Sequence, residues 1–284
     1  MQRVEKFKVS VWIQRTRQGT RVPLLMALAV CVLTAVQSCR DINVYPVSQD
    51  VSMGASIDKE LRTNSKEYKI YQDEVVRGYV QDIVKKIVAL PGIKYREQFP
   101  YTVTIIDDSK TLNAFCTPGG YIYVYTGLIK ALDNEASLAA VLGHEIAHAE
   151  CRHSTERMTK SLGAQIVLDL ALGNDASAAT QTAANLFTGL ALLRNSRDNE
   201  DEADEQSFKY LMNSVWYPGA ISYFFEKVNN RSRGGALERW TSTHPLPQDR
   251  IDATARRIKE AKLSSPTEAQ LFSDRYLQMR NRIR

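Results

Sequence analysis

Hydrophobic side chains recur along most of this chain at the spacing of amphipathic α-helices. The clearest case covers residues 73–90, where apolar positions keep a 3.6-residue period until Pro91-Gly92 ends the pattern. A second helix is predicted over residues 133–152, with Asp133 as its N-cap. The remaining helical or weakly apolar stretches lie at residues 50–63, 164–172, 184–193, 197–213, 218–229, 247–262 and 267–280.

Two short segments are instead rich in β-branched and aromatic residues, which is typical of strands. They cover residues 101–106 (YTVTII) and 121–125 (YIYVY), and the second follows the turn-forming sequence Pro118-Gly119-Gly120. We expect them to lie side by side. The pattern therefore predicts an α+β fold, mainly helical, with a small β-sheet beside the helix at residues 133–152.

The N-terminal region has the order of an export signal. A basic stretch reaches Arg21, an apolar run follows at residues 22–36, and small or polar residues precede Cys39. At about 15 residues the run is short for a membrane-spanning helix, which needs about 20. Its ending, Val-Gln-Ser-Cys, resembles a bacterial lipobox, in which the cysteine becomes the lipidated first residue. The alternative is a short anchor or uncleaved signal with an incidental cysteine.

These features predict three parts: a signal peptide over residues 1–38, a lipidated tether over 39–50 and a folded domain over 51–284. Both interpretations of the N-terminal region place the folded domain outside the cytoplasm. The expected location is the periplasm, with a lipid anchor at Cys39. Arg40 follows that cysteine in place of Asp, which favours the outer membrane by analogy with enteric bacteria.

The charge of the chain comes from its N-terminal region. The formal net charge is +5, but the first 38 residues hold six Lys/Arg and one Glu, leaving 31 basic and 31 acidic residues. A neutral body without runs of like charge gives no electrostatic footprint for nucleic acid. Hydrophobic residues make up 44% of the chain and charged residues 24%, which is the composition of an ordinary globular protein.

Two of the four cysteines lie in the predicted domain, Cys116 and Cys151. An oxidising compartment would permit them to form a disulfide. Two free buried thiols are the alternative, and the sequence leaves both open because it does not show their distance.

The strongest chemical signal is His144-Glu145-Ile146-Ala147-His148 on the helix predicted at 133–152. Four residues of helix advance about 6 Å and turn about 400°, so the two imidazoles share a face and could bind one ion. Two neutral imidazoles suit Zn²⁺, and a carboxylate beside a zinc-bound water can take its proton. The motif therefore predicts a hydrolytic zinc site.

A hydrolytic zinc site needs a third protein ligand, and the acidic stretch at residues 197–204 is the candidate. Such a run is usually a solvated face, but Glu200 and Asp204 fall on one helical stripe with Ala203, whereas Glu202 falls on another face. We assign Glu200 to the metal. We assign Asp204 to accept the free N–H of a histidine ligand.

These motifs together resemble the metallopeptidases that include the CAAX prenyl protease and the bacterial HtpX-like enzymes. The resemblance covers roughly residues 50–262 and is most similar to the periplasmic lipoprotein branch implicated in outer-membrane quality control. It departs from one member of that branch by lacking a tetratricopeptide domain. The motifs that carry it are HEIAH at 144–148, EDEAD at 200–204, THP at 243–245, Arg250-Ile251, NAF at 113–115, PGG at 118–120 and TGL at 126–128.

The resemblance implies one Zn²⁺ per chain in a gluzincin-type site, held by His144, His148 and Glu200. It implies Glu145 as general base and acid, and a sheet edge at Asn113 and Ala114 that binds a peptide as an added strand. Two further residues belong to the family's loop near the cleft. His244 would stabilise the oxyanion, cap the zinc as a removable fourth ligand, or be a structural histidine before a proline. Arg250 would bind substrate or be purely structural.

The expected function is therefore a zinc-dependent endopeptidase that hydrolyses internal peptide bonds of unfolded or misassembled cell-envelope proteins, with the zinc-bound water activated by Glu145. Its partners would be polypeptide substrates and a membrane, reached through the lipid anchor. The alternative is a chaperone-like envelope binding factor with a latent or structural zinc site, which a permanently bound His244 would favour.

Overall fold

The computed structural model describes residues 43–63, 68–172, 195–230, 244 and 248–283, and these belong to a single compact unit. The predicted signal peptide, Cys39 and the apolar stretch at 184–193 lie outside the described residues. Among the described residues, no helix has both the length and the apolar character needed to cross a bilayer.

The small sheet has three strands, β1 (Thr102–Ile106), β2 (Ala114–Thr117) and β3 (Tyr121–Tyr125), in the order β1-β3-β2. β3 pairs parallel with β1 and antiparallel with β2. The expectation that residues 101–106 and 121–125 lie side by side is confirmed. β2 is an edge strand among the described elements, and Gly119 and Gly120, both at positive φ, form the turn from β2 to β3.

The helices agree with the apolar periodicity, and the mainly helical α+β prediction is confirmed. Their bounds are α2 (Val47–Thr63), α3 (Glu74–Val88), α4 (Thr126–Ala131), α5 (Glu135–Glu150), α6 (His153–Leu172), α8 (Arg197–Leu211), α9 (Ile221–Asn230), α11 (Gln248–Glu260), α12 (Glu268–Leu271) and α13 (Ser273–Arg280). The single helix predicted at 267–280 is wrong, because Phe272 adopts a left-handed conformation and separates α12 from α13.

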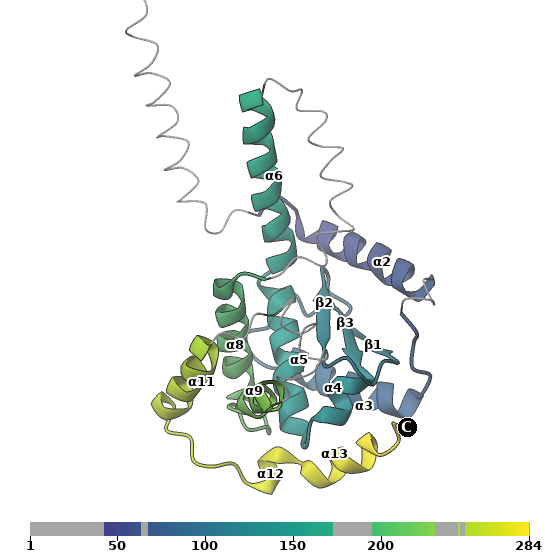
Figure 1. Cartoon of the computed structure of the whole chain (residues 1–284), viewed down its shortest axis with the longest axis vertical. Coiled ribbons are helices and arrows are strands. Elements are labelled where there is room, and N and C mark those ends of the chain that lie inside the picture. The colour runs from purple at the N-terminus through teal and green to yellow at the C-terminus, as the bar shows by residue number, and fades with distance from the viewer. Residues whose placement is uncertain (1–42, 64–67, 173–194, 231–243, 245–247, 284) are drawn as a thin grey trace, which may run out of the picture. The chain divides into compact units, whose positions relative to one another are not determined.

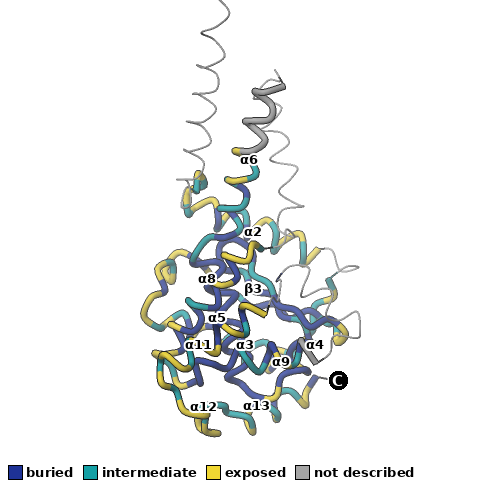
Figure 2. The backbone as a smooth tube through the Cα atoms, turned by 60° about the vertical axis from the view of Figure 1, so that its left-hand side comes forward, coloured by how far each residue is buried: buried dark blue, intermediate teal, exposed yellow. Residues whose placement is uncertain are grey.

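α5 is the central element, and all of its residues are buried (Figures 1 and 2). Its N-cap is Asn134, which accepts a hydrogen bond from the Ser137 N–H at 2.9 Å; the predicted cap, Asp133, is wrong by one residue. Gly143 lets α8 pack closely against α5, because a Cβ there would lie 2.7 Å from Ser207 Oγ. This close approach brings α8 beside the turn of α5 that carries the histidines.

Residues 43–50, which fall in the tether predicted over residues 39–50, belong to the folded unit, and residues 47–50 form the start of α2. Asn43 Nδ2 donates to Thr155 Oγ1 at 2.8 Å, and Arg152 Nε donates to the buried Asp50 at 2.6 Å. These polar contacts fix residues 43–50 against the start of α6.

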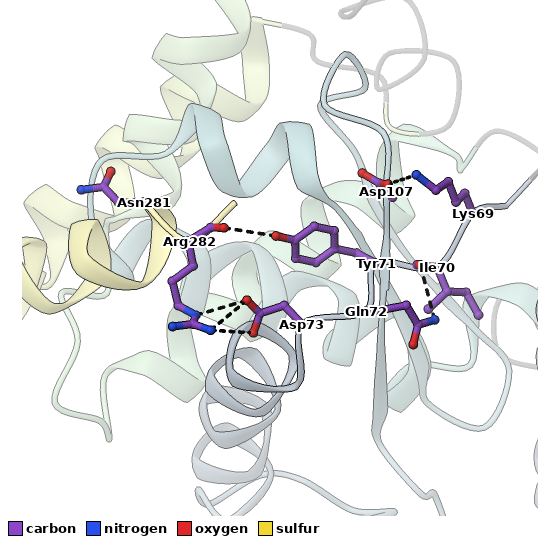
Figure 3. A pocket seen from close by; sticks show the side chains of 8 residues that line it. All are labelled: Lys69, Ile70, Tyr71, Gln72, Asp73, Asp107, Asn281 and Arg282. Carbon is purple, nitrogen blue, oxygen red and sulfur yellow. Dashed lines mark hydrogen bonds and ion pairs between the residues drawn. The ribbon is translucent and has the colours of Figure 1, made fainter. Parts of the chain in front are cut away.

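The C-terminal helices lie across the lower end of α5 and return the chain to α3 (Figure 1). Tyr276 OH donates to the Ile129 carbonyl at 2.7 Å, and Arg275 pairs with the buried Glu135 of α5. Arg282 pairs with Asp73, the N-cap of α3, beside a cavity of about 580 Å³ (Figure 3). These contacts hold the C-terminal segment against α4 and against the N-terminal ends of α3 and α5.

Candidate metal centre

Two imidazoles meet on one face of α5. The Nε2 atoms of His144 and His148 lie 3.0 Å apart, and their rings are nearly perpendicular, at 87°. Both side chains are buried. The four-residue helical spacing thus directs both nitrogens to the same point inside the protein.

α8 supplies a carboxylate at that point. Glu200, which is completely buried, places Oε1 3.2 Å from His148 Nε2 and Oε2 3.4 Å from His144 Nε2. Asp204, one turn further along α8, lies behind His144, with Oδ1 2.8 Å from Nδ1. Asp204 therefore contacts the nitrogen that faces away from Glu200.

His244 comes from a distant part of the chain and completes the group. Its Nδ1 lies 3.0 Å from Glu200 Oε1, and its ring centroid is 5.4 Å from each of the other two imidazoles. One ligand atom from each of these four residues lies within 4.8 Å of the others. Asn195 adjoins the same group and donates through Nδ2 to Glu200 Oε1 at 2.6 Å.

This donor set fits Zn²⁺. Hydrolytic zinc sites combine three protein ligands of nitrogen and oxygen type with an open position, and His144, His148 and Glu200 provide such a set. A buried carboxylate needs a cation or hydrogen-bond donors to offset its desolvation. A cation held between the two Nε2 atoms and the Glu200 carboxylate would help to meet that need.

The electrostatics of the site favour positive charge between the histidines and Glu200. Burial alone would lower the pKa of His144, but hydrogen bonds to Asp204 and Glu200 raise it to about 9. Burial and the neighbouring His144 instead hold the pKa of His148 well below its ordinary value. Although burial opposes it, His244 and the two histidines of α5 hold the pKa of Glu200 well below its usual range. Surroundings that stabilise a bound proton stabilise a bound metal cation for the same electrostatic reason.

Glu145 lies next to this group with its carboxylate in the interior. Burial raises its pKa above the ordinary carboxyl value, and His244 Nε2 lies 3.8 Å from its Oε1. Within the described part of the chain, Oε1 has no hydrogen-bond partner. A buried acceptor of this kind can take a proton from a reacting water.

Arg250 lies behind the site rather than in an open cleft. It is 2% exposed, and its guanidinium donates to both oxygens of Asp204 at 2.7 Å and to Glu200 Oε2 at 2.6 Å. It also lies over the Phe225 ring. A side chain enclosed in this way holds the two carboxylates of α8 in place, which favours the structural alternative over direct substrate binding.

Asn113 and Ala114 lie at the start of the edge strand β2, and both are buried. The Asn113 carbonyl accepts from the Tyr125 N–H at 3.0 Å, so its main chain is turned toward β3. In an antiparallel pair, alternate residues face the partner. The N–H and C=O groups of Ala114 and Cys116 therefore face away from β3, toward the free edge.

Cys116 and Cys151, for which the sequence left a disulfide and two free thiols open, are free thiols in the structure. Cys116 lies on β2 near Glu145, whereas Cys151 caps α5 and hydrogen bonds with Glu202. Each thiol therefore has its own polar neighbours, which agrees with the free-thiol alternative. Burial raises the pKa of both, that of Cys151 to about 12.

Sequence analysis assigned no role to two residues that adjoin the site, His153 and Asn195. His153, the first residue of α6, places Nδ1 2.7 Å from His148 Nδ1. Its separation of five residues from His148 spans a helix break at Arg152, so the helical period gave no signal for it. The sequence gives no signal for Asn195 either, because the position of that residue depends on where α8 begins.

The helix-borne HExxH motif, the glutamate on a second helix and the small sheet define the metallopeptidase class. Within that class, the chain belongs to peptidase family M48, whose model matches residues 74–258. The predicted resemblance is thereby confirmed.

Three relatives show the range of similarity. The chain is 26% identical over 260 residues to the putative beta-barrel assembly-enhancing protease of Vibrio cholerae, covering 85% of this chain and 52% of that protein. It is 26% identical over 241 residues to the beta-barrel assembly-enhancing protease of Escherichia coli K12, covering 81% and 47%. It is 31% identical over 191 residues to the mitochondrial metalloendopeptidase OMA1 of Schizosaccharomyces pombe, covering 66% and 55%. The chain thus spans about half the length of these relatives.

Proposed function

We propose that this protein is a zinc-dependent endopeptidase with His144, His148 and Glu200 as metal ligands. The observation that supports this most strongly is the convergence of both Nε2 atoms on the buried Glu200 carboxylate. Zinc bound there would supply Lewis acidity, which polarises a carbonyl and makes a water more acidic. Membership of a peptidase family makes peptide bonds the expected target.

Glu145 serves as the general base and then the general acid. Its buried carboxylate accepts the proton of the attacking water and returns it to the leaving amine. These transfers require the water and the amine nitrogen to lie within hydrogen-bond reach of the Glu145 carboxylate. Asp204 orients His144 through Nδ1, and Arg250 holds Asp204 and Glu200 from behind.

The substrate binds as an extended strand on β2. Ala114 and Cys116 offer their main-chain groups at the free edge, so two residues of substrate backbone can pair there without reference to side-chain identity. Asn113 contributes the neighbouring side chain, whose buried Oδ1 has no hydrogen-bond partner among the described residues. Recognition of this kind suits unfolded polypeptides.

His244 acts as a removable fourth ligand. Its Nδ1 lies as close to Glu200 as the α5 imidazoles do, and it reaches the group from outside α5 and α8. A ligand that must leave before substrate binds would keep the enzyme latent. His244→Ala should then raise peptidase activity, whereas a lower activity would support the oxyanion role instead.

The physiological substrates are unfolded or misassembled cell-envelope proteins, and the protein acts from the periplasm through a lipid anchor at Cys39. The support is the lipobox-like sequence and the name of the bacterial relatives, which are beta-barrel assembly-enhancing proteases. Labelled fatty acid should be incorporated by the wild type and not by Cys39→Ser. A wild type without label would refute the anchor.

The central experiment uses the full chain purified in detergent, with an unfolded outer-membrane protein as substrate and the folded form as comparison. Wild type should cleave the unfolded form, lose activity with a chelator and regain it with Zn²⁺. Glu200→Gln should lose both activity and most of the zinc. Glu205→Gln is the matched control, because Glu205 lies on the same helix with an exposed side chain paired to Lys209.

The chaperone-like alternative predicts a different result. A structural site with His244 permanently bound would retain zinc, suppress aggregation of the unfolded protein, and show no turnover that Glu145→Gln abolishes. Equal product release by wild type and Glu145→Gln would therefore overturn the proposed enzyme.

A further inference from the structure

The outward nitrogen of His148 meets another histidine. His148 Nε2 faces Glu200, and on the opposite side of the ring Nδ1 lies 2.7 Å from His153 Nδ1. His153 is 1% exposed, and its other nitrogen, Nε2, lies 3.2 Å from Glu202 Oε2. The Glu202 side chain is 53% exposed, so the series of contacts runs from the proposed metal position to the protein surface.

Only one placement of protons satisfies all of these contacts with neutral imidazoles. Two ring nitrogens 2.7 Å apart must share one proton, since each neutral ring has one donor and one acceptor. If His148 Nε2 binds the metal, its proton is on Nδ1 and is donated to His153 Nδ1. The His153 proton is then on Nε2, where it is donated to Glu202.

The opposite placement is disfavoured by Glu202. It would put the His153 proton on Nδ1 and leave the Nε2 lone pair facing a carboxylate at 3.2 Å, with no proton between two acceptors. Two acceptors that face each other without a proton repel, and the buried His153 nitrogen would lack a hydrogen bond. Glu202 therefore favours the same tautomer that metal binding requires.

We propose that His153 and Glu202 are positioning residues that fix His148 in its Nδ1–H tautomer and so present the Nε2 lone pair to the metal. This inference rests on the proposed zinc site. It gives each α5 histidine a carboxylate from α8: Asp204 acts directly on His144, and Glu202 acts on His148 through His153. The two carboxylates are two residues apart on α8.

The same proton order argues against a second cation at this place. Cys151, His153 and Glu202 bring three possible ligand atoms within 4.8 Å of one another. While His148 holds a metal, however, His153 Nε2 carries a proton and has no lone pair to offer. The expected content is therefore one zinc per chain.

The test exploits the small number of histidines, four in the whole chain. Full-length protein labelled with ¹⁵N-histidine and loaded with zinc is studied by long-range ¹H–¹⁵N correlation, which distinguishes protonated, unprotonated and metal-bound ring nitrogens. The expected result is a proton on Nδ1 of His148 and a proton on Nε2 of His153. A proton on His153 Nδ1 would overturn the proposal.

Variants test the energetic consequence through zinc affinity, measured by chelator competition. In His153→Asn the amide oxygen takes the place of Nδ1 as acceptor, so affinity should stay within about 3-fold of wild type. His153→Leu removes the acceptor at similar size, and affinity should fall about 10-fold to 100-fold. Equal affinity of the Asn and Leu variants would refute the chain of hydrogen bonds.

Two variants of Glu202 give a second comparison, and neither should disturb folding because the Glu202 side chain is half exposed. Glu202→Gln retains an acceptor and should bind zinc like wild type, whereas Glu202→Leu should bind several-fold more weakly. A wild type that binds no zinc would defeat the proposed function itself, which separates the two failures. Two zinc ions per chain, one of them lost in Cys151→Ser, would overturn the inference and leave the enzyme proposal intact.

Discussion

Arg250→Ala is the perturbation that separates a structural role from substrate binding. The guanidinium is buried and makes three hydrogen bonds of 2.6–2.7 Å to Asp204 and Glu200. Removing it leaves two buried carboxylates without their cation, and such a loss costs about 3–5 kcal/mol. For a domain of this size each kcal/mol shifts the melting temperature by roughly 2–4 °C, so the expected fall is about 6–20 °C.

Arg257→Ala is the matched control on the same helix. Arg257 pairs with Asp201, whose side chain is 53% exposed, so its loss should cost about 1 kcal/mol or less. Calorimetry of both variants, with zinc and with chelator, gives the comparison. Zinc should rescue part of the Arg250→Ala loss, because it restores positive charge beside Glu200. If Arg250→Ala melts like Arg257→Ala and changes only the KM for a peptide, Arg250 binds substrate and the reasoning is wrong.

Three further predictions follow from the contacts described above. Glu145→Gln should keep about one zinc per chain while hydrolysis is lost, as measured by metal analysis and peptide cleavage. Although desolvation opposes it, hydrogen bonds to the N–H groups of Val76 and Val75 lower the pKa of Asp73. Asp73→Ala should thus cost about 1 kcal/mol near pH 6. That difference should shrink as pH falls below about 4 and through the lowered pKa, because the carboxylate contribution is then lost; urea unfolding measures it. Cys116 and Cys151 should both react with an alkylating reagent in unfolded protein without reductant. If both react only after a reductant is added, the two cysteines form a disulfide.

The sequence predicted the fold well wherever one face of an element is buried. The apolar period locates α3 to within a few residues because the burial of one face enforces that period. It gives no sign of the hydrogen bonds that hold the polar segment 43–50, such as that of Arg152 to Asp50. It also fails at Phe272, whose left-handed backbone leaves no mark in the hydrophobic pattern.

The candidate site was predictable where its residues share a helix. A spacing of four residues places His144 with His148 on α5 and Glu200 with Asp204 on α8, whatever the rest of the fold does. The structure brings these two pairs together by the close contact at Gly143. That helix-to-helix contact depends on long-range packing, for which the sequence offered only the family resemblance.

Residues on either side of a helix break could not be placed by period. α5 ends at Glu150, and Arg152 has a φ of 54°, so the helical phase restarts at His153 and its direction is independent of α5. Periodicity put Glu202 on a face of α8 away from the metal, and its exposed side chain agrees with that. A side chain that faces away from the metal on its own helix can still act on a metal ligand through a second element, however. Here the start of α6 lies between α5 and the Glu202 side chain. Glu202 therefore reaches His148 through His153, and a variant there is a neutral control only if the new side chain still accepts a hydrogen bond.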